Sequence, residues 1–311
     1  MPIHSSFQAP LAELKADHAS GATTLAKLAA TLFVQLTDTQ LELPDTELAA
    51  QCTELALAVL RSQPTMAPLL NLCNRVLVTV RTAGGPEEVR ERIRSMAGGF
   101  VSQLETSTTR IALHAEPMIE EGMTIFTHSH SSAVKKTLVK AHEAGRSFSV
   151  ICTESRPIFE GTDLARELAG LDIPVTLIAD AAAFSILQEA DMAMVGSDSV
   201  SQGGVVNKIG TSGLAVAAQR MKVPFYVLCG SEKFIPDRLV MIEPTKSVEE
   251  LLSPPVPGVA VRNFYFDTTP LEELTALITE EGMQTIADVR RYLSVLEENF
   301  VLRPEDLVPS P

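Results

Sequence analysis

Residues 196–211 hold the side chains best suited to chemistry. They follow the apolar run 192–195, which is typical of a buried strand, and they end near Ile209, where a helical pattern begins. Between these points lie an acid, two adjacent glycines, an amide and an ammonium group: Asp198, Gly203, Gly204, Asn207 and Lys208. Glycines let the backbone approach a ligand closely, and the N-terminus of the following helix favours an anion. The stretch is therefore a candidate ligand-binding loop at the carboxyl end of a sheet.

Four more polar segments follow apolar runs. They are residues 127–132 (Thr-His-Ser-His-Ser-Ser), residues 153–157 (Thr-Glu-Ser-Arg-Pro), Asp180 and residues 230–234 (Gly-Ser-Glu-Lys-Phe). Each segment alone is equally well explained as a solvated loop. If the apolar runs form a parallel sheet, however, all of these segments meet at one edge, and together they favour a ligand pocket.

Cationic and hydroxyl side chains in these segments would suit a phosphate or another compact anion. The cations are Arg156, Lys208 and Lys233, and Ser131 and Ser132 add neutral donors. Two alternatives stay open. Arg156 could instead form a structural ion pair with one of three nearby carboxylates: Glu154, Glu160 or Asp163. Asp198 could be a general acid or base, or it could only cap the local turn.

The sequence favours neither a metal nor a nucleotide cofactor. His128 and His130 form an H-x-H pair, but no third ligand is evident, so we expect no metal site. Neither G-x-x-x-x-G-K-[ST] nor G-x-G-x-x-G occurs, which argues against NTPase and dinucleotide sites of those types. We therefore expect no cofactor.

Composition limits the possible partners and compartment. A chain of 311 residues predicts about two domains. Its net charge of −14 opposes nonspecific binding to nucleic acid or to anionic membranes. Four cysteines in apolar runs, without a C-x-x-C motif, predict buried free thiols in a reducing compartment: Cys52, Cys73, Cys152 and Cys229. No signal peptide and no membrane-length apolar run are visible, so we predict a cytoplasmic protein.

The pattern of elements changes along the chain. Residues 1–120 show helical periodicity, including a long helix over 87–118. Residues 121–311 alternate short apolar runs with helical stretches, with strands expected at 124–127, 148–153, 175–179, 192–195 and 225–229. Such alternation indicates βαβ units and a parallel sheet. Pro270 also suits the first turn of a helix that ends near Gly282. The fold class is thus α/β, with an N-terminal helical domain followed by a parallel-sheet domain.

At these loops the chain resembles the superfamily of the alpha, beta and delta regulatory subunits of eukaryotic translation initiation factor 2B. That group also includes methylthioribose-1-phosphate isomerase and ribose-1,5-bisphosphate isomerase. Residues 196–211 match, and residues 207–211 (Asn-Lys-Ile-Gly-Thr) are the most specific part. The other matching stretches are residues 64–65, 127–131, 153–157, 232–234, 263–270 and 278–282. The resemblance implies that residues 121–311 form a Rossmann-like domain. It also implies a homodimer or higher assembly and a ligand bound between the two domains.

The resemblance further implies site residues. The isomerases convert a cyclic aldose 1-phosphate into an open ketose phosphate, using a cysteine after Thr-His and an aspartate after the fourth strand. Asp198 matches that aspartate, whereas Ser129 stands where the cysteine would be. A thiol with a pKa of about 8.5 can be tuned to a thiolate, but a serine hydroxyl needs an adjacent base. His128 or His130 could supply it.

Two other departures concern the binding of anions. The isomerases carry an Arg-Gly-Ala segment near the N-terminus, and here the nearest match is Ser20 with Gly21 and Ala22. They also carry Arg before Pro-Thr, where this chain has Gln63. Four matching residues are kept, namely Arg156, Asn207, Lys208 and Lys233. The pattern indicates a smaller or less charged ligand, such as a monophosphate.

Three functions are compatible with these residues. The first is a sugar-phosphate aldose–ketose isomerase that uses Asp198. The second is a noncatalytic regulatory subunit, which binds a phosphosugar or nucleotide and acts through protein contacts. The third is an assembly subunit with a vestigial pocket, which the surviving cations make the least favoured. For assembly, the apolar Phe264, Tyr265 and Phe266 are candidate dimer contacts, with ordinary core packing as the alternative.

Overall fold

The computed structural model describes residues 3–17, 21–38, 45–241 and 245–307. The chain divides into two compact units. Unit 1 consists of residues 1–106, 232–241 and 294–311, and unit 2 of residues 107–231 and 242–293. The first division falls inside a helix, α5 (Pro86–Ala115), rather than near residue 120 as the sequence pattern predicts.

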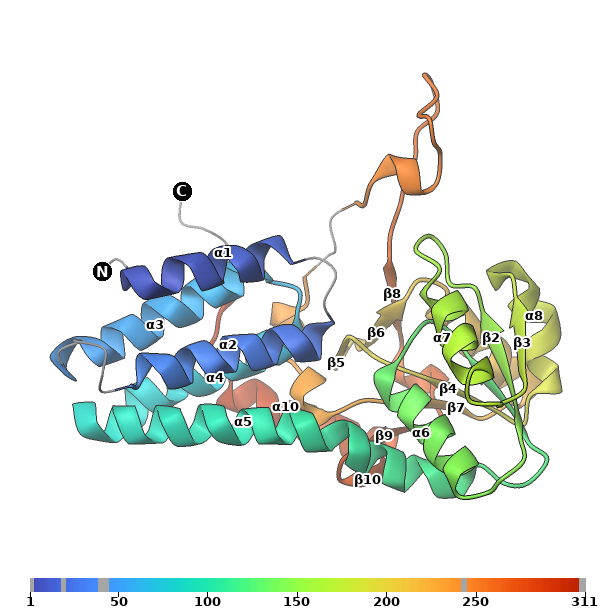
Figure 1. The fold of residues 1–311 in the computed structure, drawn as a ribbon, viewed down its shortest axis with the longest axis horizontal. Coiled ribbons are helices and arrows are strands. Elements are labelled where there is room, and N and C mark those ends of the chain that lie inside the picture. Colours follow the sequence, from blue (N-terminus) through green and yellow to red (C-terminus); the bar gives the residue numbers. More distant parts are fainter. Residues whose placement is uncertain (1–2, 18–20, 39–44, 242–244, 308–311) are drawn as a thin grey trace. The chain divides into compact units, whose positions relative to one another are not determined.

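Unit 1 is helical. It contains α1 (Gln8–Ala16), α2 (Ala22–Leu36), α3 (Asp45–Ser62), α4 (Ala67–Thr82), the first part of α5 and the end of α10 (Ile286–Asn299) (Figure 1). Its short 3-10 turns are η1 (Ser5–Phe7), η6 (Asp237–Leu239), η9 (Pro304–Leu307) and all but the first residue of η5 (Ser231–Lys233). Apolar faces at helical spacing form one core, in which Phe33, Leu55 and Phe100 are fully buried.

Two later segments also belong to this helical core. Leu239 and Leu302 are buried in the same cluster as the helices. The side-chain amide of Asn71 donates hydrogen bonds to the carbonyls of Glu232 (2.8 Å) and Phe234 (2.9 Å). Long-range contacts of this kind leave no periodic signal in the sequence.

Unit 2 is built on a seven-stranded sheet. The strands are β1 (Thr124–Thr127), β2 (Ser149–Thr153), β3 (Val175–Ile178), β4 (Met192–Val195), β7 (Phe225–Leu228), β9 (Ala276–Thr279) and β10 (Gly282–Gln284). Their order is β10-β9-β7-β4-β1-β2-β3, and every neighbouring pair is parallel except β9 with the edge strand β10. The predicted α/β fold with a parallel sheet is confirmed.

The order of the strands reverses between β1 and β4. From β1 the chain proceeds to β2 and β3 on one side, then returns to β4 and β7 on the other. The crossovers include α6 (Ser132–Glu143), α7 (Glu160–Ala169), α8 (Ala183–Ile186) and α9 (Thr211–Met221). In open α/β sheets, ligands bind outside the carboxyl ends of the strands at such a reversal.

A second, three-stranded antiparallel sheet occupies part of the expected loop 196–211. It has the order β5-β6-β8 and consists of β5 (Ser199–Ser201), β6 (Gly204–Lys208) and β8 (Phe266–Thr269). Gly204 has φ +141°, and a Cβ there would lie 2.3 Å from the Thr269 carbonyl oxygen. Only glycine therefore allows β6 to approach β8 so closely.

The predicted helix from Pro270 to Gly282 is wrong. The structure has a 3-10 turn, η8 (Leu271–Glu273), followed by β9 and β10. All four residues of β9 are buried, and β9 pairs in parallel with β7. A short, fully buried apolar run cannot be told from a helix segment by periodicity alone, and its tertiary pairing decides the outcome. The long helix also ends earlier than predicted, at Ala115, before η2 (Glu116–Met118).

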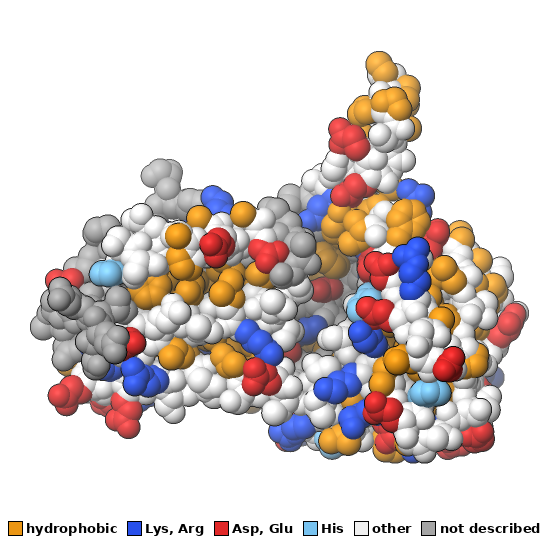
Figure 2. All heavy atoms as spheres, in the orientation of Figure 1, with side chains coloured by type: hydrophobic (Ala, Val, Ile, Leu, Met, Phe, Trp, Pro, Cys, Tyr) orange, Lys and Arg blue, Asp and Glu red, His pale blue; other side chains and the backbone are white. Residues whose placement is uncertain are grey.

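Burial agrees with the expectation for the cysteines. All four cysteines are buried and free, as predicted, and burial raises the pKa of the Cys52 and Cys152 thiols to about 12. Basic and acidic side chains are mixed over the visible surface (Figure 2). Within the described residues, no helix combines the length and apolar character needed to cross a membrane.

Candidate functional site

The loops that follow β1 and β4 pack directly against each other at the strand reversal. A Cβ on Gly196, which follows β4, would lie only 2.7 Å from the Cβ and Oγ atoms of Ser131, which follows β1. Three other residues nearby have left-handed backbone conformations although none is glycine: Ser129 (φ +70°), Ser155 (φ +62°) and Phe159 (φ +61°). Such strained residues gather at functional sites, so this edge of the sheet is the candidate site.

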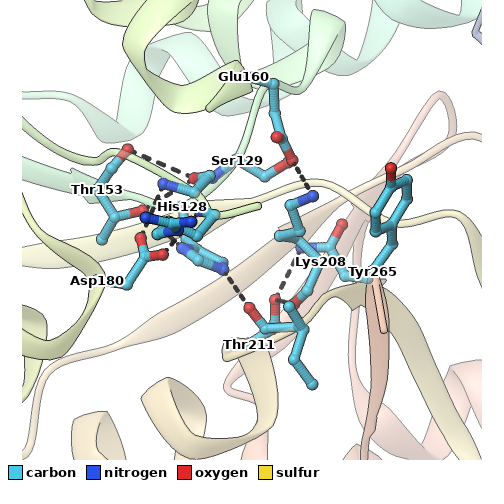
Figure 3. Close-up of polar contacts among 12 residues, drawn as sticks. His128, Ser129, Thr153, Glu160, Asp180, Lys208, Thr211 and Tyr265 are labelled. Atoms are coloured by element: carbon cyan, nitrogen blue, oxygen red, sulfur yellow. Dashed lines mark hydrogen bonds and ion pairs between the residues drawn. The ribbon is translucent and has the colours of Figure 1, made fainter. Parts of the chain in front are cut away.

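A buried ion pair lies at this edge, between Lys208 and Glu160 (Figure 3). The Lys208 Nζ atom is 2.7 Å from Glu160 Oε1, and the two side chains are 3% and 21% exposed. The same Glu160 oxygen accepts a hydrogen bond from Ser129 Oγ at 2.9 Å. We call Ser129, Glu160 and Lys208 the charged cluster.

The charged cluster has one aromatic neighbour and one unmatched oxygen. The Lys208 ammonium lies 4.9 Å from the centre of the Tyr265 ring, in cation–π contact. The second carboxylate oxygen of Glu160, Oε2, is buried and has no hydrogen-bond partner among the described residues. An unmatched buried carboxylate oxygen is costly, so it needs an explanation.

Close packing at the start of α7 fixes the position of Glu160. A Cβ on the next residue, Gly161, would lie 2.0 Å from the Thr153 carbonyl oxygen and 2.7 Å from Ser155 Oγ. Only glycine fits there, and it brings the first turn of α7 onto the end of β2. Glu160 is therefore held beside the end of β1, which neighbours β2 in the sheet.

The His128 ring is held by hydrogen bonds at both nitrogens. Nε2 lies 2.9 Å from the Ile209 carbonyl oxygen, which can only accept, so Nε2 carries the proton. Nδ1 then accepts from the Thr153 hydroxyl at 2.6 Å. The His128 pKa is lowered, mainly because the ring is buried, so the ring is neutral at pH 7.

Neither histidine is therefore placed as the base for Ser129. Both nitrogens of His128 are occupied, and His130 Nε2 bonds Glu167 Oε2 at 2.9 Å. The basic group at the Ser129 hydroxyl is the carboxylate of Glu160. Sequence reasoning considered Glu160 only as a partner for Arg156, because nothing in its spacing indicates contact with β1 or β6.

The lowered pKa of His128 predicts a specific dependence of stability on pH. Its folded-state pKa lies below the unfolded value of about 6.5, so the unfolded chain binds the proton more readily. The contribution of neutral His128 to the free energy of unfolding is complete above about pH 6.5. It is lost as the pH falls toward the folded-state pKa, by up to about 1.4 kcal/mol per pH unit.

Thermal unfolding between pH 7.5 and 5 checks this prediction. A His128→Asn variant should show a shallower loss of melting temperature than the wild-type chain, whereas His142→Gln, at an exposed position, should follow the wild type. Parallel curves for wild type and His128→Asn would contradict a buried neutral histidine.

Asp180 and Arg156 support the loop after β2. The two Asp180 carboxylate oxygens accept hydrogen bonds from the backbone amides of Ser155 and Arg156, both at 2.8 Å. The exposed Arg156 guanidinium lies 5.0 Å from the Phe159 ring centre and donates to the Glu250 carbonyl at 3.3 Å. Two of the three carboxylates considered as partners of Arg156 pair with other cations: Glu160 with Lys208, and Asp163 with Arg166.

The N-terminus of α9 already holds an anion from the chain itself. The Asp267 carboxylate in β8 accepts hydrogen bonds from the amides of Gly210 (2.8 Å) and Ser212 (3.2 Å). Burial raises the Asp267 pKa, although these two amides act in the opposite direction. The helix N-terminus that the sequence offers to a ligand anion is thus occupied by a side chain.

The remaining predicted residues of unit 2 lie around the same edge. Asp198 is half-buried between β4 and β5, and its amide donates to the Val206 carbonyl at 2.8 Å. Asn207 is buried and donates to the Thr211 hydroxyl at 3.0 Å. Ser131 caps α6 by accepting from the Val134 amide at 3.4 Å, and Ser132 is exposed. Their roles toward a ligand stay predictions.

Three predicted residues belong to unit 1. Gln63 is buried, and its amide donates to the carbonyls of Leu14 (3.0 Å) and Asp17 (2.9 Å) at the end of α1. Gly21 is exposed before α2, Lys233 is half-buried in η5, and Ser20 lies outside the described residues. Their contact with a ligand stays a prediction from the resemblance.

The two histidines of the H-x-H pair have separate partners: His128 bonds Thr153 and Ile209, and His130 bonds Glu167. Among the residues that the structure describes, no group of three His, Cys, Asp or Glu side chains is arranged to hold a metal ion.

Comparison with known proteins gives two kinds of relative. The model of the initiation factor 2 subunit family matches residues 18–286. A ribose 1,5-bisphosphate isomerase of Archaeoglobus fulgidus is 38% identical over 234 residues, covering 72% of this chain and 73% of that protein. A protein of Pyrococcus furiosus named as similar to translation initiation factor eIF-2B subunit 2 is 36% identical over 276 residues, covering 88% and 94%.

Solved structures similar to this chain also include both isomerases and initiation factors. The translation initiation factor eIF-2B of Pyrococcus horikoshii OT3 superposes with a TM-score of 0.75 at 34% identity, covering 91% of this chain and 98% of that one. The 5-methylthioribose 1-phosphate isomerase of the same organism gives 0.72 at 25% identity, covering 93% and 87%. The fold is therefore shared by proteins named as enzymes and by proteins named as initiation factors.

Proposed function

Because the chain belongs to the initiation factor 2 subunit family, we propose that it binds a small phosphorylated sugar where β1 and β4 end in unit 2. The observation that carries the proposal is the packing of the β1 and β4 loops at the strand reversal, with the charged cluster beside them. A buried ammonium, a carboxylate and a hydroxyl together offer the donors and acceptors that a sugar needs.

The phosphate group is proposed to bind at the N-terminus of α6. This helix has 12 residues and begins at Ser132, directly after the loop of β1. Its first amides and the hydroxyls of Ser131 and Ser132 are donors suited to a phosphate. The α9 N-terminus is less suitable, because Asp267 already occupies it.

For the bound sugar we propose an aldose–ketose isomerisation with Asp198 as general acid–base. A proton goes to the ring oxygen as the bond from C1 to that oxygen breaks. The hydrogen on C2 moves to C1 with its electron pair, and the 2-hydroxyl gives up its proton to become a carbonyl. One proton is supplied and one removed, so a single carboxyl group can perform both transfers. The rearrangement needs no external oxidant or reductant.

Ser129 favours a second candidate, a noncatalytic regulatory subunit. Its hydroxyl donates to Glu160, and a serine lacks the readily ionised thiol that the isomerases are expected to use at this position. The relatives named as initiation factor subunits allow this role.

A Ser129→Cys variant distinguishes the two candidates. If the chain is an isomerase working with a weak substitute, the thiol should raise turnover of a sugar 1-phosphate at least about tenfold, because a thiolate is the better acid–base group at neutral pH. Turnover is followed by NMR, with Ser185→Cys, at an exposed position in α8, as the matched control. A phosphosugar that binds both Ser129 variants but is converted by neither would favour the regulatory role.

We also propose that the chain assembles as a homodimer through unit 2. The segment after η7 (Val248–Glu250) exposes Leu251, Val256 and Val259, at 44%, 48% and 54%. Phe264 and Phe266 are half-buried, and they remain candidate contacts. Light scattering during size-exclusion chromatography at micromolar concentration should give at least twice the 33.5 kDa mass of the chain. A single-chain mass would contradict the assembly.

A further inference from the structure

We propose that Glu160 selects the sugar end of the ligand by accepting a hydrogen bond from the 2-hydroxyl, and that Lys208 donates to the same hydroxyl rather than to a phosphate. The inference rests on the proposed function. The resemblance implies that Lys208 binds the anionic group of the ligand. Here Lys208 instead binds a hydroxyl of the sugar, together with Glu160.

Charge is the first argument. Lys208 is almost fully buried and already has a carboxylate at 2.7 Å. A phosphate on Lys208 would therefore lie next to the Glu160 carboxylate in a partly desolvated site, where like charges repel strongly. A neutral group meets no such repulsion. Repulsion from the Glu160 carboxylate thus disfavours a phosphate at this end of the site.

Hydrogen-bonding capacity is the second argument. Glu160 Oε1 is used by Ser129 and Lys208, whereas Oε2 is buried and has no partner among the described residues. An ionised carboxylate can only accept, and an ammonium can only donate. A hydroxyl does both, so one sugar hydroxyl can satisfy Oε2 and accept from Lys208 at once. Oε2 is closed to solvent, so the Glu160 side chain, which is 21% exposed, must turn this oxygen toward the sugar as it binds. A carbonyl or an ether oxygen would leave Oε2 unmatched.

Position is the third argument. Ser129, which donates to Glu160, lies in the loop of β1, and that loop packs on the loop of β4 that leads to Asp198. In the proposed reaction the 2-hydroxyl is the sugar hydroxyl that loses its proton. The hydroxyl at the charged cluster is therefore assigned to C2, close to the reacting bond. It donates to Glu160 in the bound sugar, and it turns its proton toward Asp198 once Asp198 has protonated the ring oxygen.

The test compares the binding of α-D-ribose 1-phosphate with that of its 2-deoxy analogue by titration calorimetry. An Asp198→Asn background prevents conversion during the titration. With Glu160 present, the ribose compound should bind at least about 30-fold more tightly, because a site built for a hydroxyl is left with unpaired buried groups by the deoxy compound. In the Glu160→Gln variant the ratio of the two affinities should fall below about threefold. Orthophosphate should bind this variant several-fold more tightly than it binds the protein with Glu160.

Controls make the result specific. Glu167→Gln changes a carboxylate on the same helix that bonds His130 and Lys135, and it should keep the full ratio. If Glu160→Gln does not fold because Lys208 loses its counter-ion, the paired Lys208→Met and Glu160→Gln variant avoids the uncompensated charge, and it should also lose the ratio.

The outcomes separate this inference from the proposed function. Two results would overturn the role of Glu160 while the phosphosugar site stands. In the first, the Glu160→Gln variant binds both sugar phosphates tightly and keeps the same ratio of affinities. In the second, the Asp198→Asn parent binds both tightly with no preference for the ribose compound. If neither sugar phosphate nor orthophosphate binds, the proposed function fails and the inference fails with it.

Discussion

An Asp198→Asn variant is expected to lose turnover of a sugar 1-phosphate by roughly 10²–10⁴-fold while its affinity for the sugar stays within about tenfold. Asparagine keeps nearly the same shape and can still form hydrogen bonds, but it cannot take up and release a proton. The half-buried position of Asp198 between β4 and β5 tolerates the neutral side chain, so the fold should be unchanged.

The variant is checked by NMR rates and by calorimetric binding on the same preparation. Asp191→Asn is the matched control, since Asp191 lies at the opposite end of β4 and accepts a hydrogen bond from the Thr124 amide. It should keep wild-type turnover. An equal loss of turnover and affinity in Asp198→Asn would show that Asp198 supports the turn, which is the alternative left open by the sequence.

The second large effect concerns stability and the buried ion pair. Replacing Lys208 with methionine removes the counter-ion of Glu160 and leaves a largely buried carboxylate uncompensated. Loss of one partner of a buried pair costs about 3–5 kcal/mol, so the urea midpoint of unfolding, followed by circular dichroism, should fall markedly.

The paired substitution tests the cause. Adding Glu160→Gln to Lys208→Met removes the uncompensated charge, and most of the lost stability should return, since replacing a whole buried pair is often close to neutral. Lys135→Met, which removes a more exposed partner of Glu167, should change stability by less than about 1 kcal/mol. A double variant no more stable than Lys208→Met would mean that packing of the lysine chain, rather than its charge, stabilises the site.

Local patterns were sufficient to predict the five strands that form the site. Each of β1, β2, β3, β4 and β7 is a short apolar run followed by a polar loop, and parallel pairing then places those loops at one edge. The strand order was not needed for this conclusion. The strand order does, however, identify the reversal between β1 and β4. The reversal narrows the candidate site to the loops that contain Ser129 and Asp198.

Contacts distant in sequence account for what could not be predicted. Asp267 caps α9 from a strand 57 residues away from Gly210, and Glu160 meets Ser129 across 31 residues. Neither contact has a spacing signature, because both depend on how separate strands pair. The Gln63 amide, considered as a ligand contact, donates instead to the end of α1, 46 to 49 residues earlier. In this chain, periodicity indicates elements, whereas partner choice among polar side chains follows from tertiary packing.

Conversion of a sugar 1-phosphate tests the central proposal most directly. Thermal-shift screening of sugar 1-phosphates, sugar bisphosphates and nucleoside monophosphates first identifies a ligand, because a ligand of the folded state raises the melting temperature by mass action. The wild-type chain is then incubated with that ligand and followed by ¹³C and ³¹P NMR. We predict that the C1 signal of the cyclic aldose disappears while a ketose carbonyl signal appears, and that Asp198→Asn abolishes the change. A stabilising phosphosugar that stays unchanged would contradict the isomerase and leave the regulatory subunit as the function.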